Sequence, residues 1–81
     1  MIIYLIFLES VEDGMSHGSI VGVSLSFKYA KEIALKYGKE ISFMTPYIEM
    51  WDTSASRDGG DRIGRFNYNE QLKIFEFEED D

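Results

Sequence analysis

The chain has 81 residues, 15% of them aromatic, and carries a formal net charge of −7 with no cysteine. One domain is expected at this length. The lack of cysteine excludes disulfides and thiolate metal sites, and it fits a reducing cytoplasm. The negative charge argues against direct nucleic-acid binding, because phosphate contacts need lysine and arginine. The acids concentrate towards both ends of the chain, around a mildly basic middle.

The first apolar run covers residues 2–8 and is rich in β-branched and aromatic side chains. This pattern predicts a central strand that is buried on both faces. The run is far too short to cross a membrane, and it lacks the basic flank and cleavage site of a signal peptide. We therefore expect a cytoplasmic protein with no membrane partner.

A second strand is predicted at residues 20–25, after a loop at residues 9–19 that holds charges and glycines. Large and small side chains alternate in this strand, which is typical of a strand with two different faces. The alternation places Val21, Val23 and Leu25 on the face with the larger side chains.

A helix is predicted next, with clear signals at both ends. Ser26 is a candidate N-cap, because its hydroxyl can accept a hydrogen bond from a free backbone N–H. Gly38 suits the left-handed position just past the last turn. Apolar side chains recur at helical spacing and form one face. They are Phe27, Ala30, Ile33, Ala34 and Tyr37.

Residues 41–51 are predicted to form a strand interrupted at Pro46, because proline cannot donate to a hydrogen-bond ladder. A short helical turn that begins at Thr45 and Pro46 is the alternative. Residues 52–61 are polar and rich in glycine, which is typical of a long mobile loop.

The C-terminal part is predicted to hold two strands, at residues 62–66 and 72–78, with a turn at residues 67–70. The acidic residues 79–81 are expected to form a frayed tail. The whole order is β-β-α-β-β-β within residues 1–78. It predicts an α+β fold in which one helix packs on one face of a mostly antiparallel sheet of four to five strands.

One helix covers one face of such a sheet, so apolar side chains on the other face need a different cover. A symmetric partner is the simplest cover, and we expect a homodimer. Aromatic and methionine side chains are enriched at protein interfaces, although filling of the core is an equal alternative here. The candidate interface residues are Tyr47, Met50, Trp51, Phe75 and Phe77.

A small-ligand site is a second hypothesis. Arginine side chains and glycine amides can hold an anion such as a phosphate or a small nucleotide. The candidate residues are Arg57, Arg62, Arg65, Gly59 and Gly60. Asp58 and Asp61 lie among them, so ion pairing that orders a loop is the alternative.

No catalytic set, metal site or cofactor is predicted. The loop at residues 52–61 resembles a calcium loop, but Arg57 occupies the position where the sharp turn needs glycine. His17 lies near Ser16 and Ser19 without the pattern of a nucleophile elbow. We therefore expect a protein that is not an enzyme.

The second strand and the helix, at residues 20–34, resemble small uncharacterised β-β-α-β domains of bacteria and their phages. The shared features are an apolar first strand, an acidic loop, a Val-Gly-Val strand and a serine-capped helix that bears alanines, and the resemblance covers about half the chain. It implies a setting in which small acidic proteins inhibit a host or rival factor.

The leading hypothesis is a non-catalytic binding protein, anti-defence or immunity-like, that occupies the surface of a partner protein. Its acidic ends could imitate nucleic-acid phosphate in a basic groove of that partner. The alternatives are a sponge that holds a small nucleotide at a dimer groove, and a structural or assembly subunit.

Overall fold

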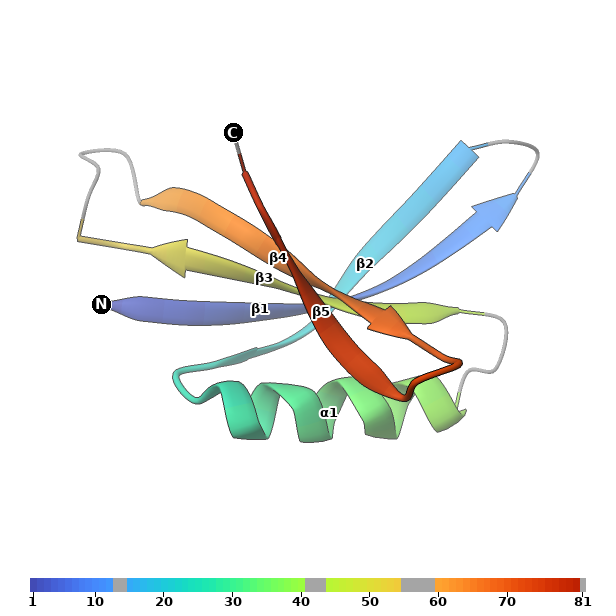
Figure 1. Cartoon of the computed structure of the whole chain (residues 1–81). Coiled ribbons are helices and arrows are strands. Elements are labelled where there is room, and N and C mark those ends of the chain that lie inside the picture. The colour runs from blue at the N-terminus through green and yellow to red at the C-terminus, as the bar shows by residue number, and fades with distance from the viewer. Residues whose placement is uncertain (13–14, 41–43, 55–59, 81) are drawn as a thin grey trace.

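The computed structural model describes residues 1–12, 15–40, 44–54 and 60–80. Its elements are β1 (Ile2–Glu12), β2 (Met15–Ser24), α1 (Phe27–Glu40), β3 (Thr45–Asp52), β4 (Asp61–Asn69) and β5 (Ile74–Glu79). The five strands form one antiparallel sheet in the order β2-β1-β3-β4-β5. α1 packs along one side of it, over β1, β3 and β2 (Figure 1). The predicted α+β fold and its β-β-α-β-β-β order are confirmed.

The core lies between α1 and the two central strands. Ile6 of β1 and Ile48 of β3 are cross-strand partners, and both are fully buried against Ala30 and Ala34 of the helix. The two alanines let the helix approach the sheet closely, and burial of each isoleucine is worth about 1.5–3 kcal/mol. We call this side of the sheet, which carries Ile6 and Ile48, the helix face. The opposite side is the open face.

The start of α1 agrees with the prediction, and its end does not. The backbone N–H of Tyr29 donates to the Ser26 hydroxyl at 3.5 Å, and the N–H of Ala30 donates to the Ser26 carbonyl at 3.0 Å. The helix then continues past Gly38 to Glu40. A β-carbon at Gly38 would lie 3.3 Å from Cγ of Pro46. This glycine therefore serves the close approach of β3 to the helix instead of ending the helix.

The loop predicted at residues 9–19 is wrong, because β1 continues to Glu12 and β2 begins at Met15. The two strands pair as far as Glu12 and Met15, and residues 13–14 lie outside the described residues. The last part of β1 and the first part of β2 lead away from the helix (Figure 1). Backbone pairing between the two strands therefore defines this part of the chain.

The two valines expected on one face of β2 are separated by a register shift. Ile6 pairs with Gly22 and the next residue of β1 pairs with Ile20, so Val21 is an extra residue in β2. Val21 packs against the core, whereas Val23 is 58% exposed. The predicted common face is therefore wrong, because a β-bulge breaks the alternation of side chains.

Pro46 does not interrupt β3, which is continuous over Thr45–Asp52, so the interruption and the alternative helical turn are both wrong there. Residues 41–43 lie outside the described residues. Pro46 pairs with Leu8 of β1, and pairing with β4 begins only at Tyr47. Its missing N–H therefore falls where β3 has a single neighbouring strand.

The turn between β4 and β5 comes later than predicted, since Asn67 still lies within β4. Asn69 makes the turn: its side-chain oxygen accepts hydrogen bonds from the backbone N–H groups of Gln71 (3.0 Å) and Leu72 (3.1 Å). Lys73 closes the turn with a φ of 58°, a left-handed conformation that residues other than glycine seldom adopt.

The acidic C-terminal residues are not frayed where the structure describes them. Glu79 ends β5. The backbone N–H of Asp80 donates to the carbonyl of Ile63 at 3.0 Å, and the Asp80 carboxylate pairs with Arg62. Asp81 lies outside the described residues.

Candidate functional site

The open face carries the side chains that alternate with the core positions of each strand, because neighbours along a strand point to opposite sides. Cross-strand pairing identifies them. They include Ile3, Leu5, Phe7, Glu9, Ile20, Val23, Thr45, Tyr47, Glu49, Trp51, Arg62, Arg65, Asn67, Glu76 and Glu78. Among the described residues, no helix or strand packs on this face.

Three neighbouring strands place a stack of side chains at the centre of this face. The rings of Phe7 and Tyr47 are stacked at 4.9 Å between centroids, with 3° between their planes. The guanidinium of Arg65 lies over the Tyr47 ring, 4.0 Å from its centroid. We call Phe7, Tyr47 and Arg65 the open-face stack. Its aromatic pair contributes about 0.5–1.5 kcal/mol beyond burial, and its cation–π contact about 0.5–1 kcal/mol.

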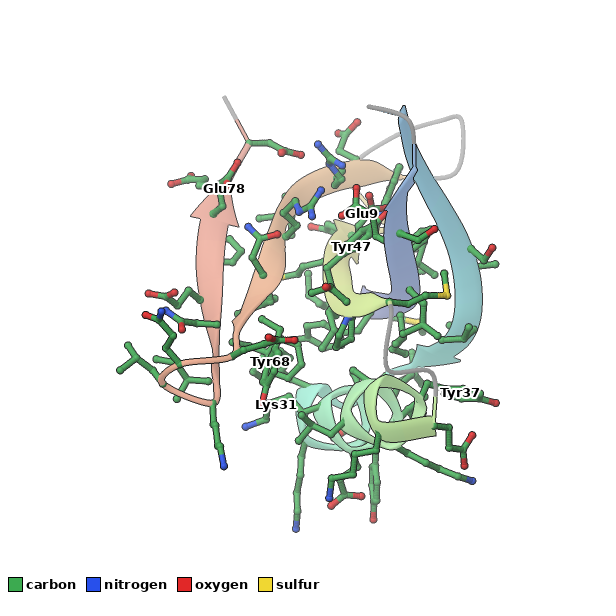
Figure 2. All side chains as sticks on the ribbon, turned by 90° about the vertical axis from the view of Figure 1, so that its right-hand side faces the viewer. Glu9, Lys31, Tyr37, Tyr47, Tyr68 and Glu78 are labelled. Carbon is green, nitrogen blue, oxygen red and sulfur yellow. The ribbon has the colours of Figure 1, made fainter. Side chains whose placement is uncertain are left out.

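Further polar contacts hold the stack in place. Arg65 Nε donates to Oδ1 of Asn67 at 2.7 Å, and its Nη2 lies 3.6 Å from a carboxylate oxygen of Glu9. Figure 2 shows Tyr47 and Glu9 together on the side of the strands away from α1. A β-carbon at Gly18 would lie 3.1 Å from the Tyr47 hydroxyl, so the glycine makes room for this ring.

The surroundings of Tyr47 also change its acidity. Burial raises the pKa of the Tyr47 phenol above 10.0, and the neighbouring carboxylate of Glu49 raises it further. The positive charge of Arg65 lowers this pKa but does not cancel the other two effects. Tyr47 is therefore protonated at neutral pH, and its hydroxyl can donate a hydrogen bond to a partner.

A second cluster on the open face centres on Arg62. Its Nε and Nη2 atoms bind the two carboxylate oxygens of Asp80 at 2.6 and 3.0 Å, and its Nη1 lies 2.9 Å from Glu49. The indole N–H of Trp51 donates to the other oxygen of Glu49 at 3.1 Å. The contacts with Asp80 and Glu49 hold the pKa of Arg62 above its usual range.

The two described arginines of the predicted anion site share a face because β4 contains an extra residue. Trp51 pairs with Arg62 while Met50 pairs with Gly64, so Ile63 is the extra residue. Both guanidiniums are engaged by carboxylates, as described above.

The other members of the predicted anion site do not join these arginines. Gly60 lies just before β4 and has a φ of 119°. A β-carbon there would lie 2.9 Å from the Asp52 carbonyl oxygen, so this glycine is needed for its backbone conformation. Arg57 and Gly59 lie outside the described residues. The described residues therefore do not form one anion cradle.

The predicted interface residues are divided between the two faces of the sheet. Tyr47 and Trp51 lie on the open face. Met50 lies on the helix face, where it pairs with Tyr4, and Phe75 packs against the core. Phe77 also lies on the helix face, 4.9 Å from Phe66, and remains 47% exposed.

Sequence reasoning missed Phe7 as a partner of Tyr47. Residues 2–8 are apolar throughout, so the pattern gave no sign of which side chains face the helix. The register of β1 against β3 supplies this information, because it pairs Phe7 with Tyr47.

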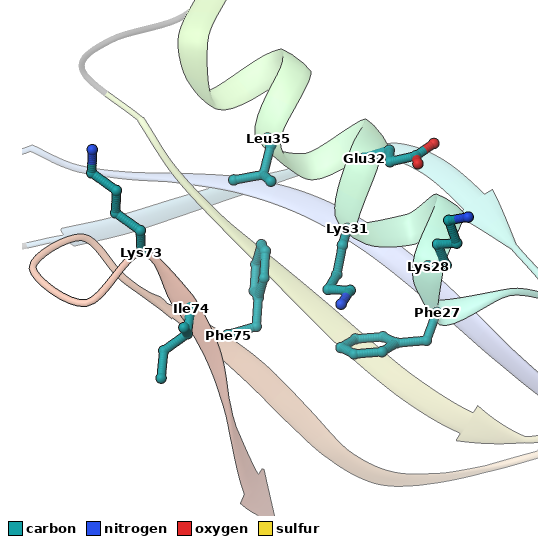
Figure 3. A pocket seen from close by; sticks show the side chains of 8 residues that line it. All are labelled: Phe27, Lys28, Lys31, Glu32, Leu35, Lys73, Ile74 and Phe75. Carbon is teal, nitrogen blue, oxygen red and sulfur yellow. The ribbon is translucent and has the colours of Figure 1, made fainter.

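A groove with a volume of about 400 Å³ lies beside α1, between the helix and the start of β5 (Figure 3). Its lining is Phe27, Lys28, Lys31, Glu32, Leu35, Lys73, Ile74 and Phe75. The ammonium of Lys31 lies 5.0 Å from the centroid of the Phe27 ring. The groove therefore combines aromatic surface with three lysines, in a chain whose net charge is −7.

Comparisons with models of protein families, with curated proteins and with solved structures give no match for this chain. Within the described residues, no three His, Cys, Asp or Glu side chains are grouped so that they could hold a metal ion. In the same part of the chain, no helix has the length and apolar character needed to cross a membrane.

Proposed function

We propose that this is a non-catalytic binding protein, which acts by occupying the surface of a partner protein with its open face. The observation that carries the proposal is the open-face stack, with Trp51 on the same face beside Arg62. Tryptophan, tyrosine and arginine dominate the binding energy of protein interfaces. Here all three types lie on a face that no other described element covers.

The contacts within this face also favour tight binding. Arg65 is held by Asn67 and Tyr47, and Trp51 is held by Glu49. Side chains that are ordered before binding lose less conformational entropy in the complex. The free protein therefore already holds much of the arrangement that a partner would need.

The chemistry of the face indicates the partner's surface. Its β1–β2 half carries the apolar side chains Leu5, Phe7, Ile20 and Val23, next to the single acid Glu9 among the residues named above. The β4–β5 half is acidic, because Glu76, Glu78 and Asp80 outnumber the arginines Arg62 and Arg65. A complementary partner has an apolar patch next to basic residues. If these residues form a groove for nucleic acid, occupying it would inhibit the partner.

This mode of action agrees with the setting that the resemblance to small bacterial and phage domains implies. We place its action in the cytoplasm, which agrees with the absence of cysteine. An anti-defence or immunity-like inhibitor is the specific form of this proposal.

A capture experiment with matched variants tests the proposal. Tagged wild-type protein is incubated with lysate of the cells in which it is made, next to Tyr47→Ser and Trp51→Ser variants. Tyr29→Ser is the control, because Tyr29 is 60% exposed on α1, away from the open face. Wild type and control should recover the same protein in near-stoichiometric amount, and the open-face variants should lose it.

The salt dependence of the recovery tests whether the partner's surface is basic. Recovery should fall as salt is added, because ion pairs at the rim of an interface are screened. Two results would overturn the proposal. One is no partner near stoichiometry, and the other is equal recovery by folded open-face variants.

The groove beside α1, which we call the lysine groove after Lys28, Lys31 and Lys73, favours a second candidate function. This function is binding of a small nucleotide. Ligand pockets commonly have volumes of about 300–1,000 Å³, and the groove has about 400 Å³. Phe27 and Phe75 offer aromatic surface for a base, and Lys31 offers a positive charge for phosphate. This site replaces the arginine set predicted from the sequence.

A thermal-shift assay with AMP, ATP and inorganic phosphate tests the groove. A ligand at 100 times its Kd stabilises the folded state by about 2.7 kcal/mol. We expect the melting temperature to rise with one of these nucleotides at about 1 mM, and the rise to be lost in Lys31→Glu. No rise with either nucleotide would exclude this candidate.

A further inference from the structure

The two edges of the sheet differ in their chemistry. β5 forms one edge and carries Glu76, Glu78 and Glu79, whereas β2 forms the other. β2 holds ten residues, with no Asp, Glu, Lys, Arg or Pro among them. Natural proteins use charges and prolines to keep edge strands from pairing with other chains. By this criterion β5 is protected and β2 is not.

Exposed apolar side chains accompany this neutral edge. Ile20 and Val23 of β2 are 53% and 58% exposed, and Leu25, just after the strand, is 67% exposed. The bulge at Val21 divides the strand, but Met15–Ile20 continues without a register shift beyond it. Strands in globular proteins average about 5–6 residues. The segment beyond the bulge is therefore long enough to pair by itself.

We propose that the outer edge of β2 pairs with β2 of a second copy of the chain, antiparallel about a twofold axis. Two five-stranded sheets then become one continuous sheet. A twofold interface needs a surface that is complementary to itself. An uncharged strand meets this condition, because no charge faces its own copy.

The overall charge also favours a second copy at this edge over other ways of pairing. Each copy carries −7, and the acids of β5 lie at the opposite edge of the sheet from β2. Pairing through β2 therefore places the two acidic edges at the outer ends of the joined sheet. Pairing through β5 would place carboxylates directly opposite carboxylates, which is destabilising.

Joining the β2 strands would also enlarge the open face. Ile20 and Val23 lie on that face, next to Phe7 and Leu5 of β1. In the pair, these apolar residues of each copy lie beside the new junction. The interface would therefore use side chains as well as backbone hydrogen bonds.

Analytical ultracentrifugation from low to high micromolar concentration tests this inference on the full chain. We expect a species of twice the 9.4 kDa monomer mass. Ile20→Lys and Val23→Lys should each shift the midpoint of dimerisation to concentrations about tenfold higher or more. Leu72→Lys is the control. It adds the same charge at a 63% exposed position in the turn before β5, and it should leave the midpoint unchanged.

Hydrogen exchange identifies the edge that is used. The outward-facing backbone amides of β2 should become protected as the concentration rises, and those of β5 should not. A monomer at high micromolar concentration would overturn the inference. So would a dimer that persists in both lysine variants, or protection of β2 that appears only when another protein is added.

Discussion

The guanidinium of Arg65 lies 4.0 Å from the centre of the Tyr47 ring, while the Phe7 ring is stacked on the same tyrosine. These residues belong to three adjacent strands, so the stack ties β1, β3 and β4 together on the open face. Burial and the Glu49 carboxylate raise the pKa of the Tyr47 phenol in this stack. The ionisation of Tyr47 therefore reports on the packing of this face.

Tyr47 should ionise above pH 10.0 in the folded protein. Its pKa is higher in the folded than in the unfolded state, so the stability it contributes is present below pH 10 and is lost as the pH rises through the folded pKa. The difference in near-ultraviolet absorbance between wild type and Tyr47→Phe gives the titration curve.

Two variants should move this curve in opposite directions. Glu49→Gln should lower the midpoint by removing a negative charge, and Arg65→Gln should raise it by removing a positive one. A midpoint at or below 10.0 in wild type, or a shift of the same sign in both variants, would contradict the described environment of Tyr47.

Arg62→Met should destabilise the fold by about 0.5–1 kcal/mol, because Arg62 pairs with both Asp80 and Glu49 and is partly exposed. Unfolding in urea gives the difference from wild type. The difference should shrink with added salt, since salt screens exposed ion pairs.

Lys36→Met is the control for Arg62→Met, because it also removes one positive charge, at a position that is exposed on α1. It should alter stability by less than about 0.5 kcal/mol. Equal effects of the two substitutions would show that the Arg62 cluster contributes nothing specific.

Asp52 should titrate below its ordinary pKa of 3.8, because it accepts hydrogen bonds from the hydroxyl and the backbone N–H of Ser54. The N-terminal ammonium, 3.5 Å away, contributes as well. A lowered pKa means that the stability from Asp52 is present above the unfolded pKa and is lost as the pH falls through the folded one.

A carboxyl-detected NMR titration measures the midpoint of Asp52 directly. Ser54→Ala should raise this midpoint towards 3.8 by removing the hydroxyl. Thr53→Val is the control, because the Thr53 hydroxyl donates to the Met1 carbonyl instead. An unchanged midpoint in Ser54→Ala would refute the assigned cause.

Gly64→Ala should destabilise the protein by about 1–3 kcal/mol. A β-carbon there would lie 2.6 Å from the Glu78 carbonyl oxygen and 2.7 Å from the Phe77 ring, so β5 would have to move. Gly22→Ala is the matched control, because its nearest neighbour, Ile33, would lie at 3.4 Å. Thermal and urea unfolding should separate the two variants, and equal losses would argue against the described packing of β5 on β4.

The fold class was predictable because it depends on local patterns. The serine cap at Ser26 and the apolar helical face fix the position of α1, and the runs of apolar residues locate the strands. The ends of β1 and β2 carry no apolar pattern in the sequence, and cross-strand pairing places them instead. Gly38 was assigned to a helix end, since its contact with Pro46 depends on tertiary structure.

In the candidate site, too, some positions follow from local sequence patterns and others depend on tertiary structure. Met50 and Trp51 were assigned to one interface, although they are adjacent in a predicted strand and the alternation of side chains places them on opposite faces. The common face of Arg62 and Arg65 did not follow, because it depends on the extra residue Ile63. The lysine groove brings α1 next to the start of β5, and no local pattern in the sequence links these segments.

The acids along β5 limit how far a sheet built from this chain can grow. A sheet whose edge strand β2 is neutral and whose other edge strand β5 is acidic allows one junction between copies and opposes the next. Self-association that uses β2 therefore ends at two molecules and does not propagate into a fibre. The same carboxylates that give the open face its charge would thus let the protein accumulate to high concentration without polymerising.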